Sequence, residues 1–317
     1  MPKKILMLML SSCGFGLGIT GLAQASEYYS PMQPGISTGV PAGALPPPGL
    51  YADLGTNFDS GAVNNGSGHA TGIKLSQASF TGELLYSPGW KLLNASYGMR
   101  LALPFSLNNV EHGPPDGQTN YTGYGFFNPI ITPEILSWNL GGGNFISEGL
   151  TFYLPIGDFK HEYNPEAERQ VESVNSFANH YWTFEPNLAY TYLASGWNIT
   201  LNNTFDFNST NHITHYHTGD LYYLDYTIAH DFGPFSLGVI GNYTQQFTDD
   251  EVNGVALPAN PANGDSAGSR FMHTAIGPLI SYNLGKVSFT LRYLEGLAGR
   301  NGGNASFLHF DVSFPIS

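Results

Sequence analysis

Three histidines form the densest group of potential metal ligands in the sequence. His212, His215 and His217 lie within residues 211–217, and Asp220 follows shortly after. Neutral imidazoles bind zinc or copper, but a structural site needs about four fixed ligands. The chain has no second cluster at a spacing typical of metal sites. We therefore expect a solvent-exposed loop and no metal or other cofactor, with these three histidines as the candidates if a metal does bind.

A second possible chemistry is that of a serine hydrolase. His309, Asp311 and Ser313 alternate along one segment. A triad needs its hydroxyl, base and acid within hydrogen-bond reach, whereas residues i and i+4 of a strand are about 13 Å apart at ~3.3 Å per residue. Gly141, Gly142 and Gly143 precede no helical pattern, so they do not form a phosphate-binding loop. We predict that the protein is not an enzyme.

The elements that carry these residues alternate between apolar and polar positions from Gly49 to the end of the chain. Residues 92–105 show the pattern clearly, with one apolar face formed by Leu93, Ala95, Tyr97, Met99, Leu101, Leu103 and Phe105. Successive side chains of a strand point to opposite faces. Ten or so residues at a barrel's tilt cross a bilayer, whereas strands of soluble proteins are usually about 5–6 residues long.

Twelve such segments follow one another, and their connections are alternately short and long. The segments are residues 49–58, 72–86, 90–105, 124–138, 148–158, 181–194, 196–208, 218–231, 235–248, 270–284, 286–298 and 305–316. Short turns at one end and long loops at the other are typical of outer-membrane barrels. We therefore predict an all-β fold, a single antiparallel transmembrane β-barrel of about 12 strands over residues 49–317. Both chain ends would lie on the periplasmic, short-turn side.

A soluble β-sandwich also alternates between two faces, but it would need neither strands of this length nor loops sorted by length. Five prolines fall inside the predicted strands. Proline cannot donate to a β-ladder, so we expect bulges or strand ends at Pro129, Pro133, Pro155, Pro186 and Pro278.

The composition agrees with a membrane barrel and excludes other classes. Charged residues make up 11% of the chain, against roughly 25% in soluble domains, and aromatic residues make up 14%. Outside the N-terminus no apolar run approaches the ~20 residues of a spanning helix. The net charge of −13 argues against nucleic acid as a partner, because no basic patch is present to displace phosphate counterions.

Residues 1–25 have the form of an export signal. Lys3 and Lys4 precede an apolar stretch, and the segment ends in Ala23-Gln24-Ala25, a small-x-small cleavage site. The expected mature chain begins at Ser26. A lipoprotein-type cleavage before Cys13 is the alternative; otherwise removal of the signal leaves no cysteine for disulfides or thiolate chemistry.

Residues 26–48 are rich in proline, glycine and serine, which favours an extended, partly polyproline conformation. The sequence leaves two interpretations open, a periplasmic tail and a plug inside the barrel.

The polar faces of the strands carry the candidate site, which is the lining of a lumen. Seven acids and two bases are expected there: Asp53, Glu83, Arg100, Glu134, Glu185, Asp206, Asp225, Arg292 and Asp311. Lumen side chains set the selectivity of barrels, although acid–base pairs can simply brace the interior. The excess of acids predicts a mild cation preference. A hydrophobic substrate would instead need apolar contacts, for which Tyr51, Tyr153 and Phe307 are candidates.

Four tryptophans flank predicted turns or loops. Trp90, Trp138 and Trp197 lie near short turns, and Trp182 follows a long loop. Because amphipathic rings favour the headgroup level, we interpret these residues as an interface girdle, with ordinary strand-end packing as the alternative.

Several motifs resemble a known family. They include Phe127-Asn128-Pro129, Tyr153-Leu154-Pro155-Ile156-Gly157, Tyr181-Trp182-Thr183-Phe184-Glu185-Pro186, Gly196-Trp197 and Ile276-Gly277-Pro278. The sequence is similar to the outer-membrane transporters of the meta-pathway of phenol degradation, which include the sphingosine-induced outer-membrane proteins. The resemblance implies an outer-membrane channel for hydrophobic or aromatic molecules and no catalytic residues.

These expectations converge on a channel in the bacterial outer membrane. A twelve-stranded barrel is narrower than the 16-stranded porins, so we expect passive uptake of a restricted set of small molecules. The expected partners are outer-membrane lipid, the barrel-assembly machinery acting on the C-terminal strand, and a small-molecule substrate. The alternatives are a closed structural or adhesive barrel that acts through its outer loops and, less favoured, a barrel lipid hydrolase.

Overall fold

The structure is a computed structural model, and it describes residues 30–112, 121–165, 167–173, 176–259, 261 and 267–316. The expected signal peptide, Cys13 and residues 26–29 lie outside the described residues. Within the described part of the chain no helix is long and apolar enough to cross a membrane.

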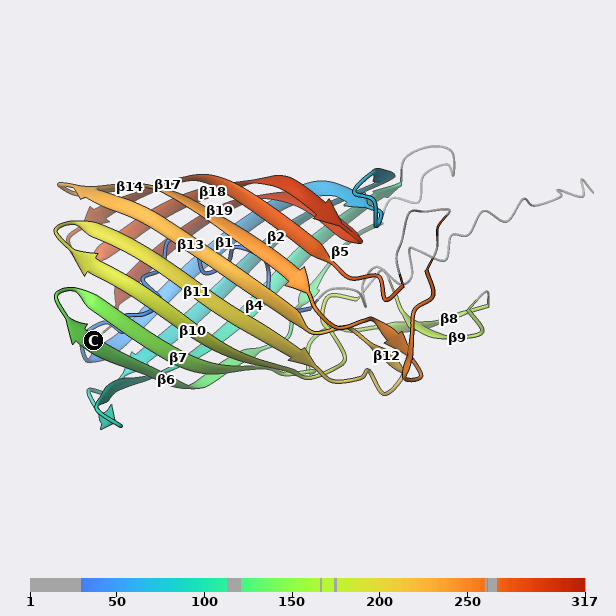
Figure 1. The fold of residues 1–317 in the computed structure, drawn as a ribbon, viewed down its shortest axis with the longest axis horizontal. Helices are drawn as coiled ribbons and strands as arrows, with labels where there is room; N and C mark the ends of the chain where they lie inside the picture. The colour runs from blue at the N-terminus through green and yellow to red at the C-terminus, as the bar shows by residue number, and fades with distance from the viewer. Residues whose placement is uncertain are drawn as a thin grey trace, which may run out of the picture.

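Twelve long strands of the described residues form one closed antiparallel barrel (Figure 1). Each strand pairs with the next in sequence order, and the last pairs with the first, so the sheet has no open edge. The predicted fold class, strand number and order are confirmed. The strands are β1 (Gly49–Asn64), β2 (Ala70–Ser87), β4 (Ala95–His112), β6 (Ile130–Gly141), β7 (Asn144–Tyr153), β10 (Thr183–Ala194), β11 (Trp197–Asn208), β13 (Leu221–Phe232), β14 (Phe235–Gln246), β17 (Met272–Leu284), β18 (Val287–Arg300) and β19 (Gly302–Pro315).

Short strands extend the long-loop end of the barrel, here called the outer end. β5 (Tyr121–Phe126) pairs with the end of β4. β8 (His161–Asn164) and β9 (Arg169–Glu172) form a hairpin, and β12 (Tyr216–His217), β15 (Glu251–Val252) and β16 (Val255–Ala256) form a small sheet. Figure 1 shows β8, β9 and β12 beyond the outer end of the long strands, whereas β5 lies along the rim beside β4. At the opposite, short-turn end, β3 (Lys91–Leu92) forms a hairpin with β4.

Several predicted strand boundaries are wrong by a few residues. The predicted strand over 124–138 is divided into β5 and β6, because residues 127–129 leave the ladder. Leu93 and Asn94 adopt φ angles of 52° and 65° and form the β3–β4 turn instead of starting a strand. At the outer end β1 and β4 continue into regions predicted to be loops, because a strand that rises above the lipid no longer needs an apolar face.

The prolines lie at interruptions of the ladder, as expected. Pro129 precedes β6 and Pro155 follows β7. Pro133 falls in a bulge, where the β6–β7 register shifts between Ile131 and Glu134. Pro186 pairs with Leu150 on β7, but the described β10–β11 register omits it. Pro278 likewise pairs on the β14 side only.

The two faces of the wall differ in composition. Leu201 and Phe205 on β11 are exposed on the outside, whereas Thr204 and Asp206, on either side of Phe205, are buried inside. Other exposed outward residues include Leu54, Phe58, Phe80, Leu101, Leu103, Leu188, Leu237, Ile280, Leu291 and Phe310. An apolar exterior around a polar interior suits a barrel whose outside contacts lipid.

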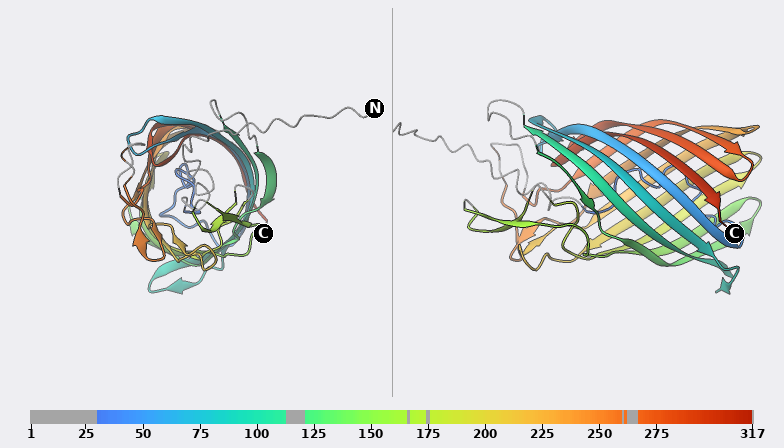
Figure 2. Two further views of the ribbon diagram at one scale, coloured as in Figure 1. Left: turned by 90° about the vertical axis from the view of Figure 1, so that its right-hand side faces the viewer. Right: turned by 180° about the vertical axis from the view of Figure 1, so that it is seen from behind.

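Residues 30–48, here called the inner segment, lie within the barrel and fill part of its lumen. Figure 2 shows this stretch in blue inside the ring of strands when the barrel is viewed along its axis. Ser30 contacts Asn208, at the outer end of β11, and Pro48 adjoins β1 at the short-turn end. The segment therefore runs from the outer side towards the periplasmic side. For residues 30–48 this position agrees with the plug of the two interpretations left open, and the N-terminal end itself lies outside the described residues.

Candidate functional site

The candidate site is the lumen lining together with the inner segment that contacts it. Eight of the nine charged residues predicted to face the lumen do so: Asp53, Glu83, Arg100, Glu185, Asp206, Asp225, Arg292 and Asp311. The ninth, Glu134, was predicted to face the lumen but faces outward. The bulge at Pro133 places Glu134 opposite Leu150, on the outward face, because one extra residue in a strand reverses the facing of every later residue.

Two opposite charges hold the middle of the inner segment. The Asp225 carboxylate accepts hydrogen bonds from Gly35 N at 3.1 Å, Ser37 N at 3.0 Å and Ser37 Oγ at 2.7 Å. Arg292 donates from Nη1 to the carbonyl oxygens of Ile36 at 2.9 Å and Thr38. An anion on the N–H groups and a cation on the carbonyl groups clamp a single turn from both sides.

Glycine is required at two points of this turn. Gly35 and Gly39 have φ angles of +81° and +83°, a backbone conformation that residues with a Cβ atom rarely adopt. A Cβ on Gly35 would lie 2.4 Å from Leu294 Cδ1, and one on Gly39 would lie 2.7 Å from Leu279 Cδ1. The turn thus rests directly against an apolar part of the wall.

The short-turn half of the segment is held by neutral groups. Gly43 N donates to Thr191 Oγ1 at 2.9 Å. Ser137 Oγ donates to the Gly43 carbonyl at 2.8 Å, and Ser147 Oγ donates to the Ala42 carbonyl at 2.7 Å. These serine and threonine hydroxyls come from three adjacent strands, β6, β7 and β10, whose inward positions are occupied by small polar residues.

The ion pairs of the lumen connect neighbouring strands. Arg292 binds Asp311 through Nε at 3.1 Å and Nη2 at 2.7 Å, so one guanidinium joins β18, β19 and the inner segment. Ser313 donates to Asp53 across the seam between β19 and β1. Arg100 lies 3.8 Å from Glu83, and both are about one-third exposed. Arg292 therefore connects the wall to the inner segment, whereas the Arg100–Glu83 pair remains partly exposed.

A second acid pair lies nearer the outer end. Glu185 on β10 and Asp206 on β11 are 5% and 0% exposed, and their carboxyl groups are close enough to interact electrostatically. Glu185 Oε2 and Asp206 Oδ1 have no hydrogen-bond partner among the described residues. The Ser30 hydroxyl donates to Asp206 Oδ2. The beginning of the described inner segment is thus attached to a buried acid, as its middle is.

Two apolar clusters face the lumen. Met32 of the inner segment packs with Tyr153, Leu221, Tyr223 and Phe271, and Phe127 and Ile130 lie against this group, here called the Met32 cluster. Phe307 belongs to a second cluster with Ala229, Ile240, Ala275, Leu279 and Leu294. Of the three predicted apolar contacts, Tyr153 and Phe307 are in these clusters, and Tyr51 donates instead to the Pro47 carbonyl at 2.8 Å.

Sequence reasoning missed several lumen residues. Asp59 was not predicted, because the predicted strand ended at Phe58. In the structure β1 continues to Asn64, and Asn57 Nδ2 donates a hydrogen bond to Asp59 Oδ1 at 3.2 Å. His273, which the sequence did not single out, is fully buried inside the barrel, as is His309, which the alternation had placed on the polar face of the last strand. Extending the apolar–polar alternation of β1 beyond Phe58 would have placed Asp59 in the lumen. No pattern in the sequence indicated that Met32 would pack against the wall.

The tryptophans lie at the ends of strands. Trp90 is 62% exposed and stacks on Tyr97, and Trp182 is 52% exposed just before β10. Trp197 begins β11 and packs edge-on against His230. Trp138 donates from Nε1 to the Leu93 carbonyl at 3.0 Å. These positions are compatible with a girdle, which stays a prediction.

The histidines of the 211–217 loop do not converge on one another. Among the described residues no group of three His, Cys, Asp or Glu side chains is arranged to hold a metal ion. The ring of His212 instead packs against that of His180. His180 stacks on Phe159, with 3.7 Å between the ring centroids, and lies beside His161. Burial, together with the nearby His212, lowers the pKa of both His161 and His180.

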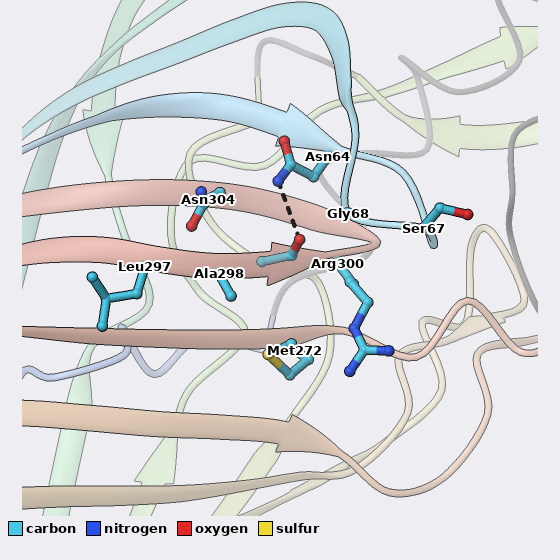
Figure 3. Close-up of a pocket in the computed structure, with 9 residues that line it drawn as sticks. Asn64, Ser67, Gly68, Met272, Leu297, Ala298, Arg300 and Asn304 are labelled. Atoms are coloured by element: carbon cyan, nitrogen blue, oxygen red, sulfur yellow. Dashed lines mark hydrogen bonds between the residues drawn. The ribbon is translucent and has the colours of Figure 1, made fainter.

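Cavities adjoin both mouths of the barrel. At the short-turn end, a cavity of about 370 Å³ lies beside Leu45, Pro46, Pro47 and Pro48. At the outer end, a cavity of about 360 Å³ is bounded by β1, β17, β18 and β19 (Figure 3). There Asn64 donates to the Gly299 carbonyl at 3.1 Å, and Leu297, Met272 and Arg300 line the same space.

Solved structures confirm the architecture. The COG4313 outer membrane channel from Pseudomonas putida F1 superposes with a TM-score of 0.69 at 14% identity, over 89% of this chain and 99% of that one. The translocator domain of the autotransporter NalP from Neisseria meningitidis gives a TM-score of 0.50 at 9% identity, over 84% of this chain and 88% of that one. At these identities the similarity concerns the fold, that of a bacterial outer-membrane barrel.

Sequence comparison narrows the assignment further. No curated protein matches the chain significantly. A family match, however, extends over residues 58–308, from the middle of β1 to the middle of β19. It thus includes ten of the twelve long strands completely, parts of β1 and β19, and the charged residues that hold the inner segment, Asp206, Asp225 and Arg292. The chain belongs to the family described as Putative MetA-pathway of phenol degradation.

Proposed function

We propose that this protein is an outer-membrane channel for passive uptake of small molecules, with the inner segment as the element that restricts passage. The observation that carries the proposal is a closed, lipid-facing barrel whose polar lumen is occupied by a segment held mainly through hydrogen bonds. Hydrogen bonds to a wall can be exchanged for water, so movement of such a segment would break few apolar contacts other than those of Met32 and of the turn at Gly35 and Gly39.

The substrate class we propose is small hydrophobic or aromatic molecules. The family description refers to phenol degradation, and the similar structure from Pseudomonas putida is named a channel. The Met32 and Phe307 clusters supply apolar surface inside an otherwise polar lumen. Tyr153 and Phe307 are the proposed contacts. The exposed acids of the lumen, including Glu83, would favour cations over anions among charged solutes.

Lipid and the barrel-assembly machinery are the proposed macromolecular partners. The outward apolar residues contact lipid tails, and the four tryptophans mark the interfaces. β19 ends in Phe314 and Pro315 and closes the barrel on β1. An apolar, aromatic end of the last strand is the part of the chain we expect that machinery to bind.

One observation favours a second candidate function. Because the inner segment fills part of the lumen, the barrel could remain closed and act through its outer elements, such as the β8–β9 hairpin. Permeability separates this structural or adhesive role from transport.

Liposome swelling with solutes of graded size tests the proposal. We expect slow, size-limited uptake through the wild-type protein and much faster uptake when residues 31–45 are replaced by a glycine–serine stretch of equal length. A heat-modifiable band on a denaturing gel would control for folding. If the replaced protein folds and still passes neither a small sugar nor a small aromatic solute, transport is excluded and the closed-barrel role remains.

A further inference from the structure

The Met32 cluster has the composition of a ligand site that the chain itself occupies. We propose that it binds a small uncharged molecule with an apolar body and one hydroxyl group, and that Met32 and Ser30 occupy the site until such a molecule displaces them. The inference rests on the proposed channel function, because it gives the ligand a place on the path through the lumen.

The position of the cluster suits the first contact of a molecule arriving from outside. Tyr153 is the last residue of β7 and Leu221 the first of β13, so both lie at the outer end of the wall. Phe271 immediately precedes β17 at the same end. Met32 fills the space between these side chains and is 5% exposed. Methionine adapts to irregular apolar surfaces and makes favourable contacts with aromatic rings, which suits a replaceable occupant.

The polar end of the site is the Asp206 carboxylate. It accepts the Ser30 hydroxyl and is itself fully buried. Its other oxygen, Oδ1, is buried and has no hydrogen-bond partner among the described residues. Removal of residues 30–32 would leave this carboxylate short of donors inside the wall, which is costly unless a new donor arrives. A molecule that replaces Ser30 and Met32 must therefore supply both a hydroxyl and an apolar body.

Charge restricts the ligand further. Glu185 lies against Asp206, so a carboxylate or phenolate would face two acids and be repelled. The tyrosine, leucine and phenylalanine side chains around Met32 carry no charge. Arg100, the cation whose charge acts on Tyr153 and Glu185, already pairs with Glu83. An added anion would therefore be desolvated with little compensation. An uncharged alcohol or phenol satisfies both conditions.

The beginning of the inner segment can move while the rest stays in place. Residues 35–45 are held by Asp225, Arg292, Thr191, Ser137 and Ser147. The described contacts of residues 30–34 are fewer: Ser30 with Asp206 and Asn208, and Gln33 Oε1 with Asn57 Nδ2 at 2.9 Å. Gln33 Nε2 is buried and has no hydrogen-bond partner among the described residues. Displacement of residues 30–34 therefore breaks few bonds.

Binding of 1-naphthol to the full-length mature protein in lipid nanodiscs tests the inference. Met32→Ala removes the apolar occupant, and we expect it to bind 1-naphthol roughly tenfold more tightly than wild type, because the ligand no longer competes with a buried side chain. Met99→Ala is the matched control. Met99 lies on β4 opposite Tyr86, outside the lumen, and its loss should leave the affinity unchanged. We expect 1-naphthoate to bind neither protein.

The hydroxyl requirement and the displacement each have their own measurement. Asp206→Ala should abolish the preference for 1-naphthol over naphthalene. Met32→Cys introduces a buried thiol into a mature chain with no other cysteine, and 1-naphthol should raise the rate at which an impermeant maleimide labels it. Equal 1-naphthol affinities for wild type and Met32→Ala, or a labelling rate unaffected by saturating 1-naphthol, would overturn the inference.

These results are separable from those on transport. Swelling assays report flux, whereas nanodisc binding reports occupancy. If 1-naphthol binds but no solute passes, the channel proposal is excluded and the binding site is retained. If solutes pass but Met32→Ala does not change 1-naphthol binding, the channel is retained and the proposed site is excluded.

Discussion

Replacement of Asp225 by alanine should loosen the inner segment without removing it. Asp225 is 2% exposed and accepts three hydrogen bonds from residues 35–37. Each hydrogen bond to a charged group contributes about 1.5–3 kcal/mol, and breaking a buried charged network costs about 3–5 kcal/mol. Since about 1.4 kcal/mol is a factor of ten, the population of the bound turn relative to the displaced turn should fall by a factor between roughly 100 and several thousand.

The assay is single-channel recording in planar bilayers. We expect Asp225→Ala to open more often, or to larger conductance, than wild type, but less than the variant with residues 31–45 replaced, because Thr191, Ser137 and Ser147 still hold residues 42–43. Asp231→Ala is the charge-matched control, since Asp231 is exposed at the short-turn end and contacts Ser236, not the segment.

Two outcomes would refute this reasoning. If Asp225→Ala and Asp231→Ala both conduct as wild type while the replaced variant conducts freely, the carboxylate does not hold the segment. If the replaced variant folds and shows no added conductance, the segment does not close the lumen.

Three further predictions concern lipid, pH and charge. Leu101→Arg on the outward face should lower the free energy of unfolding in bilayers by about 2–4 kcal/mol, whereas Leu92→Arg in the β3–β4 hairpin should change it little; equal losses in urea titrations would contradict a lipid-facing Leu101. The lowered pKa of His180, due to burial and then to His212 and His161, means that the loosened loop binds a proton more readily than the ordered one. Acidification from about pH 7.5 to 5.5 should therefore increase the rate of amide hydrogen exchange in the outer loops. His180→Phe should remove this increase. An equal increase in that variant would exclude His180 as the cause. The variant with residues 31–45 replaced should show a cation-selective reversal potential in a salt gradient, and an anion-selective one would contradict the excess of lumen acids.

The sequence was sufficient for the barrel because its signal is local. The alternation on β11 and β13 depends on the facing of neighbouring residues, and a closed sheet of such strands follows from the need to satisfy every backbone group in lipid. The signal weakens where lipid ends, which explains why β1 and β4 are longer than predicted and why Asp59 was missed. Glu134 was misplaced because the bulge at Pro133 reverses the facing, and alternation read from residue types cannot detect one extra residue.

The contents of the lumen were less predictable because they depend on contacts between residues far apart in the chain. Proline and glycine showed that residues 26–48 would not form a strand, but not where they would lie. The positions of Ser30 beside Asp206 and of Gly35 beside Asp225 join residues 176 and 190 positions apart. Likewise, His212 packs against His180 from a different loop, so the histidine spacing alone suggested the wrong neighbours.

The inner segment is covalently joined to β1 through Pro46, Pro47 and Pro48. An occupant tethered this closely to its site behaves as an intramolecular competitor, with an effective concentration on the order of millimolar. A released segment would re-bind as soon as the competing molecule departs. Sustained opening would therefore follow the local abundance of solute at the cell surface, and the barrel would close again by itself when that supply ends.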